Sequence, residues 1–420
     1  MFRDFLFLER VLGIGRKLIP RPVFEFFQPW YHGILALSGA VIFGWPSERI
    51  KVIGVTGSKG KSTTVFLITK FLKEAGYKVA AIGSLGFKIG DREWPNTLKM
   101  TMPGRWKIQK FLAEAVRAGC QFAVLEITSE GIKQKRHLGI NFDTAVFTNL
   151  EKEHIESHGS FDRYYREKQR LFERTKSIHI LNADSPYVYL FSKFPAEKKI
   201  FYSLKDYSFN NHLQGDFNKY NILAAAETVK NYGVHLETIQ KALDKIKSIP
   251  GRMEFIDAGQ SFKVVVDYAH TPGSLEAVYK TLRSTFNIPQ SKLICVLGAA
   301  GGGRDKWKRP MFGQLAENYC DQIILTDEDP YDENPEGIIE EIVSGFSQTQ
   351  NSKLKIKKYE KILDRKEAIK KALTFAEKND IVVITGKGSE TSIAIAGGKK
   401  IPWSDKDIVL EILENTKHEI

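Results

Sequence analysis

The sequence has few cysteines and no long apolar run. Three cysteines, Cys120, Cys295 and Cys320, occur in 420 residues and show no paired spacing. This argues against a zinc ribbon and against disulfide bonds, and for a reducing compartment. The longest apolar run, residues 34–45, covers twelve residues, whereas a membrane-spanning helix needs about 20. The first twenty residues mix charges with apolar side chains and lack a small-residue cleavage site. They do not resemble a signal peptide, so a cytoplasmic protein is expected.

Internal repeats and low-complexity segments are also lacking. The sequence is 42% hydrophobic and 27% charged, which is typical of a soluble globular protein and excludes fibrous and disordered classes. Its length predicts two or three domains. The net charge of +12 favours an anionic partner, which could be a phosphorylated substrate, a nucleic acid or a membrane surface. The lysines are spread along the chain as on solvated helix faces, so charge alone does not decide among these partners.

The order of apolar segments predicts the α/β fold class. Residues 1–47 are expected to form a helical, aromatic N-terminal segment closed by Pro46. Short β-branched runs alternate with helical patterns through residues 48–249, which predicts a central domain with a mostly parallel sheet. A helix is expected over residues 62–75. The predicted strands of this domain are residues 51–57, 79–83, 122–127, 144–150 and 178–184.

A domain boundary is predicted at Pro250-Gly251, where turn residues separate a helix from strands. Beyond it the runs VVVDYAH, LICVLG, QIILTD and DIVVITG alternate with helices. Residues 250–420 are therefore expected to form a second, Rossmann-like α/β domain.

The strongest motif is GVTGSKGKSTT at residues 54–64. A strand enters a glycine-rich turn and Lys-Ser opens a helix, so backbone N–H groups and a helix N-terminus point at phosphate. Lys61 is placed for the β- and γ-phosphates and Ser62 for Mg²⁺. Val55 stands where a strict Walker loop has glycine. A turn with a solvated lysine is the alternative. We predict a variant ATP loop made by Gly57, Ser58, Lys59, Gly60, Lys61, Ser62 and Thr63.

This variant loop resembles that of the Mur ligase family. Further motifs follow in the family's order from about residue 35 to 405: LEITSEG, FTNLEKEHIESHG, REKQ, LNAD, GDFNKYN, PGRMEF, VVDYAHTPGSLE, GGGRDKWKRP and GKGSE. DYAHTP and GRDKWKRP resemble the branch that adds the third residue of the peptidoglycan stem peptide. The resemblance implies a central P-loop ATPase domain and a monomeric, ADP-forming amide ligase. Such an enzyme joins an amino acid to a muramyl-dipeptide-type acceptor through an acyl phosphate.

The resemblance also implies ATP and two Mg²⁺ ions, with Ser62 serving one ion and Glu126 and His154 the other. Glu126 ends a predicted strand and His154 follows another, where α/β sheets bind ligands; a surface glutamate and a loop histidine are the alternatives. Lys168 lies in an amphipathic helix and matches a lysine that the family carbamylates, because a buried lysine can lose its proton. A solvated lysine is the alternative. The expected catalytic residues are thus Lys61, Glu126, His154 and Lys168.

The remaining site residues come from the same resemblance. Asn218 and Asn221 would lie beside the ATP base, although both are also typical helix caps. The other expected nucleotide contacts are Arg252, Asp267, His270, Arg304 and Lys306. The expected contacts to the amino acid and the muramyl peptide are Thr128, Ser129, Arg136, Glu328, Asp329, Tyr331, Gly386 and Glu390.

Two departures from the family pattern concern the substrates. Tyr331 replaces the arginine that grips the distal carboxylate of diaminopimelate, which argues against that donor and favours lysine or another amino acid. Only 53 residues precede Gly54, so the small domain that holds the UDP-sugar is expected to be absent and the carrier on the acceptor stays open. The aromatic stretch 24–30 suggests either contact with a membrane surface or a helix docked on the next domain.

Three alternatives differ in function. A related ligase could act on a lipid-linked, folate-like or storage-peptide acceptor, although DYAHTP argues against folate and no extra ATP-grasp domain supports a storage polymer. A P-loop nucleic-acid ATPase would fit the basic charge, but aromatic-basic RNA motifs are lacking, so no nucleic-acid partner is expected. An inactive scaffold is disfavoured because the ATP loop, Glu126, His154 and Lys168 are all present.

Overall fold

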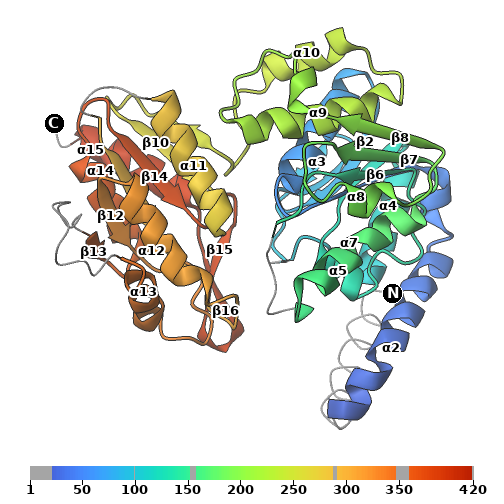
Figure 1. Cartoon of the computed structure of the whole chain (residues 1–420), viewed down its shortest axis with the longest axis horizontal. Helices are drawn as coiled ribbons and strands as arrows, with labels where there is room; N and C mark the ends of the chain where they lie inside the picture. The colour runs from blue at the N-terminus through green and yellow to red at the C-terminus, as the bar shows by residue number, and fades with distance from the viewer. Residues whose placement is uncertain (1–20, 99, 152–157, 287–290, 347–358, 419–420) are drawn as a thin grey trace.

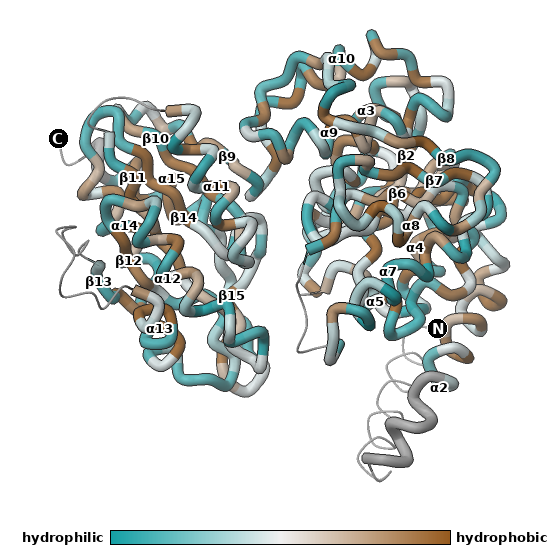
Figure 2. The backbone as a smooth tube through the Cα atoms, in the orientation of Figure 1, coloured by the Kyte–Doolittle hydropathy of each residue, from teal (hydrophilic) through white to brown (hydrophobic). Residues whose placement is uncertain are grey.

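The computed structural model describes residues 21–98, 100–151, 158–286, 291–346 and 359–418. Two α/β lobes lie side by side (Figure 1), each built on its own sheet. Brown, hydrophobic segments run through both sheets in Figure 2. The predicted α/β class is therefore confirmed, with a mostly parallel sheet in the first lobe.

The central lobe contains an eight-stranded sheet in the order β4-β3-β2-β5-β1-β6-β7-β8. Its parallel strands are β1 (Lys51–Thr56), β2 (Val79–Gly83), β5 (Phe122–Glu126), β6 (Thr144–Phe147), β7 (Ile178–Asn182) and β8 (Lys198–Tyr202). All of them except the mostly exposed edge strand β8 are buried by helices on both faces, which explains their apolar runs. The antiparallel extension is β3 (Gly86–Ile89) and β4 (Arg92–Trp94).

Helices cover both faces of this sheet. One core includes side chains of α3 (Lys61–Glu74), α9 (Asp216–Lys230) and α10 (Leu236–Lys245). The other includes side chains of α4 (Arg105–Arg117), α7 (Phe161–Arg174) and α8 (Tyr189–Ser192). The short helix α5 (Ser129–Lys133) follows β5 at its carboxyl end. The loops at the carboxyl edge of the strands are therefore left for ligands.

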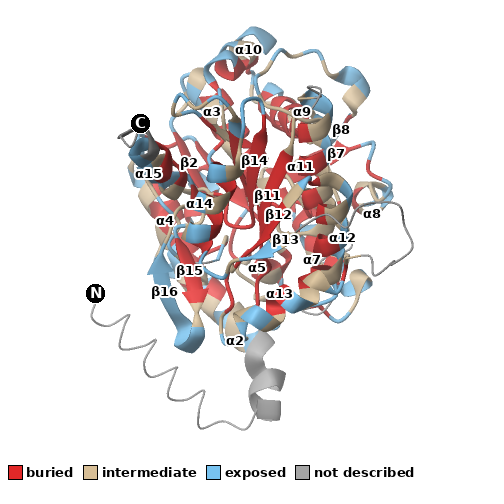
Figure 3. Ribbon diagram, turned by 90° about the vertical axis from the view of Figure 1, so that its left-hand side faces the viewer, coloured by how far each residue is buried: buried red, intermediate tan, exposed pale blue. Residues whose placement is uncertain are grey.

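The second lobe contains a six-stranded sheet in the order β13-β12-β11-β14-β10-β9. Figure 3 shows β11, β12 and β14 in the colour of buried residues. The strands are β9 (Glu254–Ile256), β10 (Lys263–Asp267), β11 (Leu293–Leu297), β12 (Gln322–Leu325), β13 (Tyr359–Lys361) and β14 (Ile381–Thr385), with a separate hairpin of β15 (Ser392–Ile395) and β16 (Lys399–Pro402). The helices are α11 (Pro272–Thr285), α12 (Lys308–Tyr319) and α13 (Pro335–Val343) on one core, and α14 (Arg365–Phe375) and α15 (Asp405–His418) on the other.

The N-terminal segment differs from its prediction. Helix α2 (Arg21–Ile42) ends four residues before Pro46, at a turn in which Gly44 has φ +68°. Pro46 instead opens a short 3₁₀ helix, Pro46–Arg49, because proline fits the first turn of a helix. Of the helices that the structure describes, none combines the length and the apolar character that crossing a bilayer requires.

The expectation that the cysteines are unpaired is wrong for two of the three. Cys295 in β11 and Cys320 after α12 form a disulfide bond, with their Cα atoms 6.0 Å apart. They are 25 residues apart in sequence, and only the crossover from β11 through α12 to β12 brings them together. Cys120 is buried and free. Sequence spacing alone could not reveal the pair.

Gly251 is a position where only glycine fits. Its φ is +61°, and an added Cβ would lie 2.1 Å from Ser389 N and 2.4 Å from Gly388 C. Gly251→Ala is therefore expected to lower the free energy of unfolding by more than about 2 kcal/mol. Gly233→Ala is the matched control, because Gly233 has φ +81° but nothing within 4 Å of an added Cβ. Equal losses in chemical denaturation would show that the clash has no effect.

Candidate active site

The phosphate loop connects β1 to α3. An added Cβ at Gly57 (φ +154°) would lie 1.9 Å from Thr148 Oγ1. One at Gly60 (φ +78°) would lie 2.2 Å from Asn221 Oδ1. The loop therefore needs glycine at both positions to fit between its neighbours. Its folding leaves the N-terminus of α3, which begins at Lys61, at the carboxyl edge of the sheet.

Lys61 is folded back over its own loop. Its Nζ donates hydrogen bonds to the carbonyl oxygens of Ser58 (2.6 Å) and Gly57 (3.0 Å). The ammonium group is thus held beside the N-terminus of α3, and both attract phosphate.

Ser62 and Glu126 lie together where a divalent cation would bind. Ser62 Oγ donates to Glu126 Oε1 (3.1 Å), and the backbone N–H of Ser84 donates to Glu126 Oε2 (2.8 Å). Glu126 is 3% exposed, so the surface-glutamate interpretation is wrong. Hard oxygen donors of this kind suit Mg²⁺, which commonly completes its shell with phosphates and water. Within the described ranges no three His, Cys, Asp or Glu side chains form a metal site, and His154 lies outside those ranges.

Lys168 is buried, which contradicts the solvated-lysine interpretation. Its side chain on α7 is 2% exposed, and Nζ donates to the Gly57 carbonyl at 2.7 Å. The same ammonium lies 4.7 Å from the centre of the Tyr164 ring. Tyr164 in turn shares a 2.9 Å hydrogen bond with Ser58 Oγ. Lys168 therefore supports the phosphate loop from behind.

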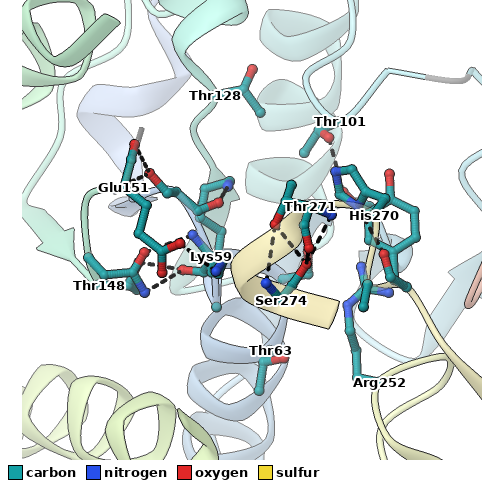
Figure 4. A pocket seen from close by; sticks show the side chains of 18 of the residues that line it. Lys59, Thr63, Thr101, Thr128, Thr148, Glu151, Arg252, His270, Thr271 and Ser274 are labelled. Atoms are coloured by element: carbon teal, nitrogen blue, oxygen red, sulfur yellow. Dashed lines mark hydrogen bonds and ion pairs between the residues drawn. The ribbon is translucent and has the colours of Figure 1, made fainter. Parts of the chain in front are cut away.

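The phosphate loop is also tied to the segment after β6. Lys59 N donates to Asn149 Oδ1 (2.8 Å) and Thr148 Oγ1 donates to Lys59 O (2.7 Å). Lys59 Nζ forms an ion pair with Glu151 at 2.5 Å (Figure 4). An added Cβ at Gly273, in the first turn of α11, would lie 2.5 Å from this Nζ and 2.8 Å from Glu151 Oε2. The two lobes therefore meet at the Lys59–Glu151 pair, which sequence reasoning missed although Glu151 closely follows a strand.

The residues expected to contact the nucleotide come from both lobes. Asn221 Nδ2 donates to Asn218 Oδ1 at 3.3 Å inside α9, whose N-cap is Gly215. The capping interpretation of these asparagines is therefore wrong. The Arg252 guanidinium lies 4.3 Å from the centre of the Tyr268 ring. The backbone carbonyl oxygen of Tyr268 lies 2.8 Å from His270 Nδ1. Figure 4 shows Arg252 and His270 beside the first turn of α11.

Asp267 organises the start of the loop between β10 and α11. Its carboxylate accepts hydrogen bonds from Met253 N (2.6 Å) and Ala269 N (2.7 Å). Burial raises the pKa of Asp267, and the charge of Arg252 acts against that shift. The carboxylate thus fixes the backbone between β10 and α11.

A cationic loop follows β11 and is organised by Glu333. The Glu333 carboxylate accepts hydrogen bonds from Gly303 N (2.9 Å) and Arg309 Nη2 (3.0 Å), and Lys306 Nζ lies 3.3 Å from it. Sequence reasoning did not select Glu333. Arg304 extends from the same loop and donates to Tyr331 Oη at 3.0 Å.

Glu333 predicts a pH-dependent stability. The Gly303 N–H is the largest cause that lowers its pKa from 4.5 to about 2, and Arg309 and Lys306 act in the same direction. A depressed folded-state pKa contributes stability above the unfolded pKa that is lost as pH falls. Glu333→Gln is expected to lower the melting temperature most above pH 4.5, and the difference from the unsubstituted chain should vanish towards pH 2. Glu340→Gln, in an exposed pair with Lys361, is the control in melts from pH 7 to 3. A difference independent of pH would contradict the assignment.

Buried charges surround the end of β14. Lys387, which sequence reasoning missed, is 0% exposed and donates to Asp329 Oδ1 (2.9 Å) and Glu390 Oε2 (2.6 Å). Tyr268 Oη donates to Glu390 Oε1 at 3.3 Å. Burial raises the pKa of Glu328, against the opposing charge of Lys387. Glu390 thus lines the cleft between the lobes, where Lys387, itself held by Asp329, fixes its carboxylate.

The backbone here is close-packed. Gly386 has φ +107°, and its Cβ would lie 2.5 Å from Glu328 Oε2. Tyr331 has φ +53°. These conformations place the β12–α13 and β14–β15 loops against each other.

The residues after β5 form the opposite end of the site. Thr128 Oγ1 accepts from Gly131 N at 3.1 Å and caps α5, and Ser129 Oγ lies 3.1 Å from His158 Nε2. Arg136 donates to Gln134 Oε1 at 2.6 Å. Burial lowers the pKa of Arg105 to about 10, with Arg136 as the second cause. Arg136 lines the cleft, where its charge would suit an anionic group, whereas Arg105 at the start of α4 does not line it.

One cleft of about 1660 Å³ joins these parts. Seventeen of the expected residues line it: Ser58, Lys59, Gly60, Lys61, Ser62, Thr63, Glu126, Thr128, Ser129, Arg136, Asn218, Asn221, Arg252, Asp267, His270, Arg304 and Glu390. The other described ones do not line it: Gly57, Lys168, Lys306, Glu328, Asp329, Tyr331 and Gly386.

Comparisons with known proteins agree with this arrangement. Residues 55–212 match the Mur ligase middle domain, and residues 251–388 match the Mur ligase, glutamate ligase domain. The chain is 38% identical over 404 residues to a UDP-N-acetylmuramoyl-L-alanyl-D-glutamate–2,6-diaminopimelate ligase of Aquifex aeolicus, covering 90% of this chain and 80% of the relative. It is 35% identical over 413 residues to a UDP-N-acetylmuramyl-tripeptide synthetase of Roseiflexus, covering 88% and 80%.

Solved structures give the same picture. The structure of a UDP-N-acetylmuramoyl-L-alanyl-D-glutamate–2,6-diaminopimelate ligase matches with a TM-score of 0.57 and 31% identity, over 88% of this chain and 79% of that one. A folylpolyglutamate synthase of Mycobacterium tuberculosis matches with a TM-score of 0.67 over 84% and 92%, but at 16% identity it shows the fold alone. The chain belongs to the Mur ligase family, as an ADP-forming ligase that joins an acid to an amino acid in peptidoglycan precursor synthesis.

Proposed function

We propose that this ligase adds an amino acid to the terminal carboxylate of a muramyl-dipeptide-type acceptor through an acyl phosphate. The proposal is supported above all by the single cleft, which joins the phosphate loop with Lys61 to Glu390 and Arg304 of the other lobe. Residues 48–249 would be the ATP-binding domain and residues 250–420 the ligase domain, preceded by residues 1–47.

The first step makes the acyl phosphate. The acceptor carboxylate attacks the γ-phosphate of ATP, a new C–O–P linkage forms, and ADP leaves with the electrons of the broken P–O bond. Two anions must meet in this step, so Lys61 and the N-terminus of α3 would stabilise the developing charge. Arg304 would add a further cation from the second lobe.

A divalent metal fits the oxygen donors at the loop, and we propose two Mg²⁺ ions. Ser62 would hold one ion, and Glu126 with His154 the other, supplying charge neutralisation at the phosphates. A carbamate on Lys168 is part of the proposal. It is supported by the buried position of Nζ, 2.7 Å from the Gly57 carbonyl.

The second step forms the amide bond. The incoming ammonium first loses one proton to solvent, the neutral amine then attacks the acyl carbon, and the C–O bond to phosphate breaks. The leaving phosphate takes up the second proton of the amine. Glu390 would receive the incoming ammonium because its carboxylate lines the cleft, held by Lys387 and Tyr268. Water must be excluded, since it would hydrolyse the acyl phosphate. The contact between Gly273 and the Lys59–Glu151 pair supports closure of the second lobe onto the phosphate loop.

We propose that the amino acid added to the acceptor has no distal carboxylate, and that it is lysine. Relatives such as that of Aquifex aeolicus are named for 2,6-diaminopimelate. Here Tyr331 occupies the position of the arginine expected to grip that carboxylate. Arg304 donates to the Tyr331 hydroxyl, so this cation already has a partner beside the donor site.

The test is phosphate release from ATP and Mg²⁺ with UDP-N-acetylmuramoyl-L-Ala-D-Glu and single amino acids. Turnover with lysine but not diaminopimelate is expected. Diaminopimelate as the preferred donor would overturn the donor proposal. Turnover with no amino acid, from protein that still binds ATP, would overturn the UDP-linked acceptor. It would move the assignment to a lipid-linked or other carboxylate acceptor.

We also propose that the enzyme is a cytoplasmic monomer that uses small-molecule substrates and no nucleic acid, and that its N-terminal segment contacts a membrane surface. Sedimentation of the purified chain tests the monomer, because a stable dimer would double the mass.

A further inference from the structure

Helix α2 carries a continuous apolar stripe on its solvent face. Of the fourteen large hydrophobic side chains exposed in the described part of the chain, six lie within residues 30–45. Their spacing follows the turns of the helix, with Trp45 in the turn beyond it. The stripe consists of Trp30 (70% exposed), Ile34 (67%), Leu37 (45%), Val41 (61%), Ile42 (58%) and Trp45 (42%). Scattered single residues need no explanation, but a contiguous patch indicates a binding surface.

The opposite face of α2 is fixed on the central lobe. Ala36 and Ala40 are fully buried, and α2 packs on α4. Trp106 Nε1 on α4 donates to Ser38 Oγ at 3.1 Å, and the Trp106 ring lies 6.5 Å from that of Phe43. The orientation of the helix is therefore set, and the stripe points away from the lobe, at whose rim α2 projects (Figure 1).

The chemistry around the stripe favours a lipid surface as its occupant. Residues 26–47 contain no Asp, Glu, Lys or Arg, whereas the first 25 residues contain five Lys or Arg and three Asp or Glu. Exposed Arg49 donates to the Gly44 carbonyl beside Trp45 and adds positive charge at this end of the stripe, next to exposed Glu48. Tryptophan, present near both ends of the stripe, is enriched at membrane–water interfaces. A helix with this composition that is unable to span a bilayer lies in the plane of the interface.

We propose that α2 docks the enzyme on an anionic membrane surface, with the stripe from Trp30 to Trp45 inserted among the lipid headgroups. The surface adjoins the cleft. An added Cβ at Gly33 would lie 3.8 Å from the side chain of Lys135, between Gln134 and Arg136, which line the cleft. Docking would therefore hold near the membrane the end of the cleft that Gln134 and Arg136 line, where the muramyl peptide is expected to bind. This consequence rests on the proposed ligase function, but the docking itself does not.

The test is flotation of the full chain with phospholipid vesicles. Vesicles of phosphatidylcholine with phosphatidylglycerol are expected to carry the protein, with weaker binding at high salt and to phosphatidylcholine alone. Ile34→Glu with Val41→Glu should reduce the bound fraction at least tenfold. Leu236→Glu is the matched control, because Leu236 is 52% exposed on α10, at the other end of the lobe in Figure 1. It should bind like the unsubstituted chain.

Docking would be overturned if the full chain does not float with anionic vesicles, or if the double variant floats equally well. A dimer in sedimentation that the double variant converts to a monomer would also overturn it, since the stripe would then bind a second copy. So would binding that appears only after deletion of residues 1–20, since that segment would then cover the stripe. Turnover with the soluble acceptor should be unchanged in the double variant, so a failure of docking is distinguishable from a failure of the ligase proposal.

Discussion

Lys61→Ala is expected to lower kcat by about 10³-fold, in the range found when one charge-stabilising donor is removed from an active site. The ammonium of Lys61 is held beside the N-terminus of α3 by the carbonyls of Gly57 and Ser58. It would therefore face the γ-phosphate when negative charge develops there. Backbone N–H groups of the loop remain, so ATP should still bind, with a smaller change in KM than in kcat. Phosphate release with saturating substrates measures both.

Lys73→Ala is the control for Lys61→Ala. Lys73 lies on the same helix, with its side chain 50% exposed and paired with Asp91 at 2.9 Å. Its removal should leave kcat within about twofold, because exposed pairs contribute little. A Lys61→Ala enzyme with an unchanged kcat would exclude this lysine from the transition state.

Lys168→Ala is expected to lower kcat by about 10²- to 10³-fold, which again corresponds to one lost charge-stabilising group. The buried side chain contacts the phosphate loop at the Gly57 carbonyl. If Lys168 carries the proposed carbamate, Lys168→Arg should be equally impaired, because a guanidinium keeps its proton and does not take up CO₂. The enzyme with Lys168 should lose activity when CO₂ is removed and regain it with bicarbonate.

A purely structural role for Lys168 makes a different prediction. Melting temperature would then fall with activity, and bicarbonate would have no effect. Lys88→Ala is the matched control, since Lys88 is also buried (7% exposed) but pairs with Glu93 away from the cleft. The carbamate is supported if bicarbonate restores activity in enzymes that retain Lys168 and has no effect on the Lys168 variants. Full activity of Lys168→Ala would exclude it.

Much of the fold could be predicted because its strands are buried on both faces. β1, β2, β5, β11 and β14 are largely apolar runs, and each begins and ends within two residues of its prediction, whereas β10 ends three residues before its predicted end. The short strands β3, β4, β9 and β13 were missed. Several of them lie at sheet edges, where one face is solvated and the apolar pattern is weak. The hairpin β15–β16 was also missed; β16 is exposed throughout, whereas β15 is largely buried.

The site was predictable where a motif fixes local geometry and not where partners come from elsewhere. The glycine spacing indicated the phosphate loop, and Gly57 and Gly60 prove to be sterically required. Glu333 lies in no motif, and Glu151 and Lys387 lie inside FTNLEKEHIESHG and GKGSE, which gave neither of them a role. Each is recognised only from its contacts with Lys59, Gly303 and Asp329, which the fold brings together across 30 to 92 residues. Long-range pairs of this kind leave no trace in spacing.

The Cys295–Cys320 bond gives the two lobes different responses to a thiol reductant. It closes a loop of 25 residues inside the second lobe. In the chain-entropy model, this cross-link lowers the entropy of the unfolded chain and so raises the free energy of unfolding of that lobe by about 3.5 kcal/mol. The first lobe contains only Cys120, which is free. Reduction should thus shift one denaturation transition and leave the other in place. Adding the reductant would then show which denaturation transition belongs to which lobe, without any substitution in the chain.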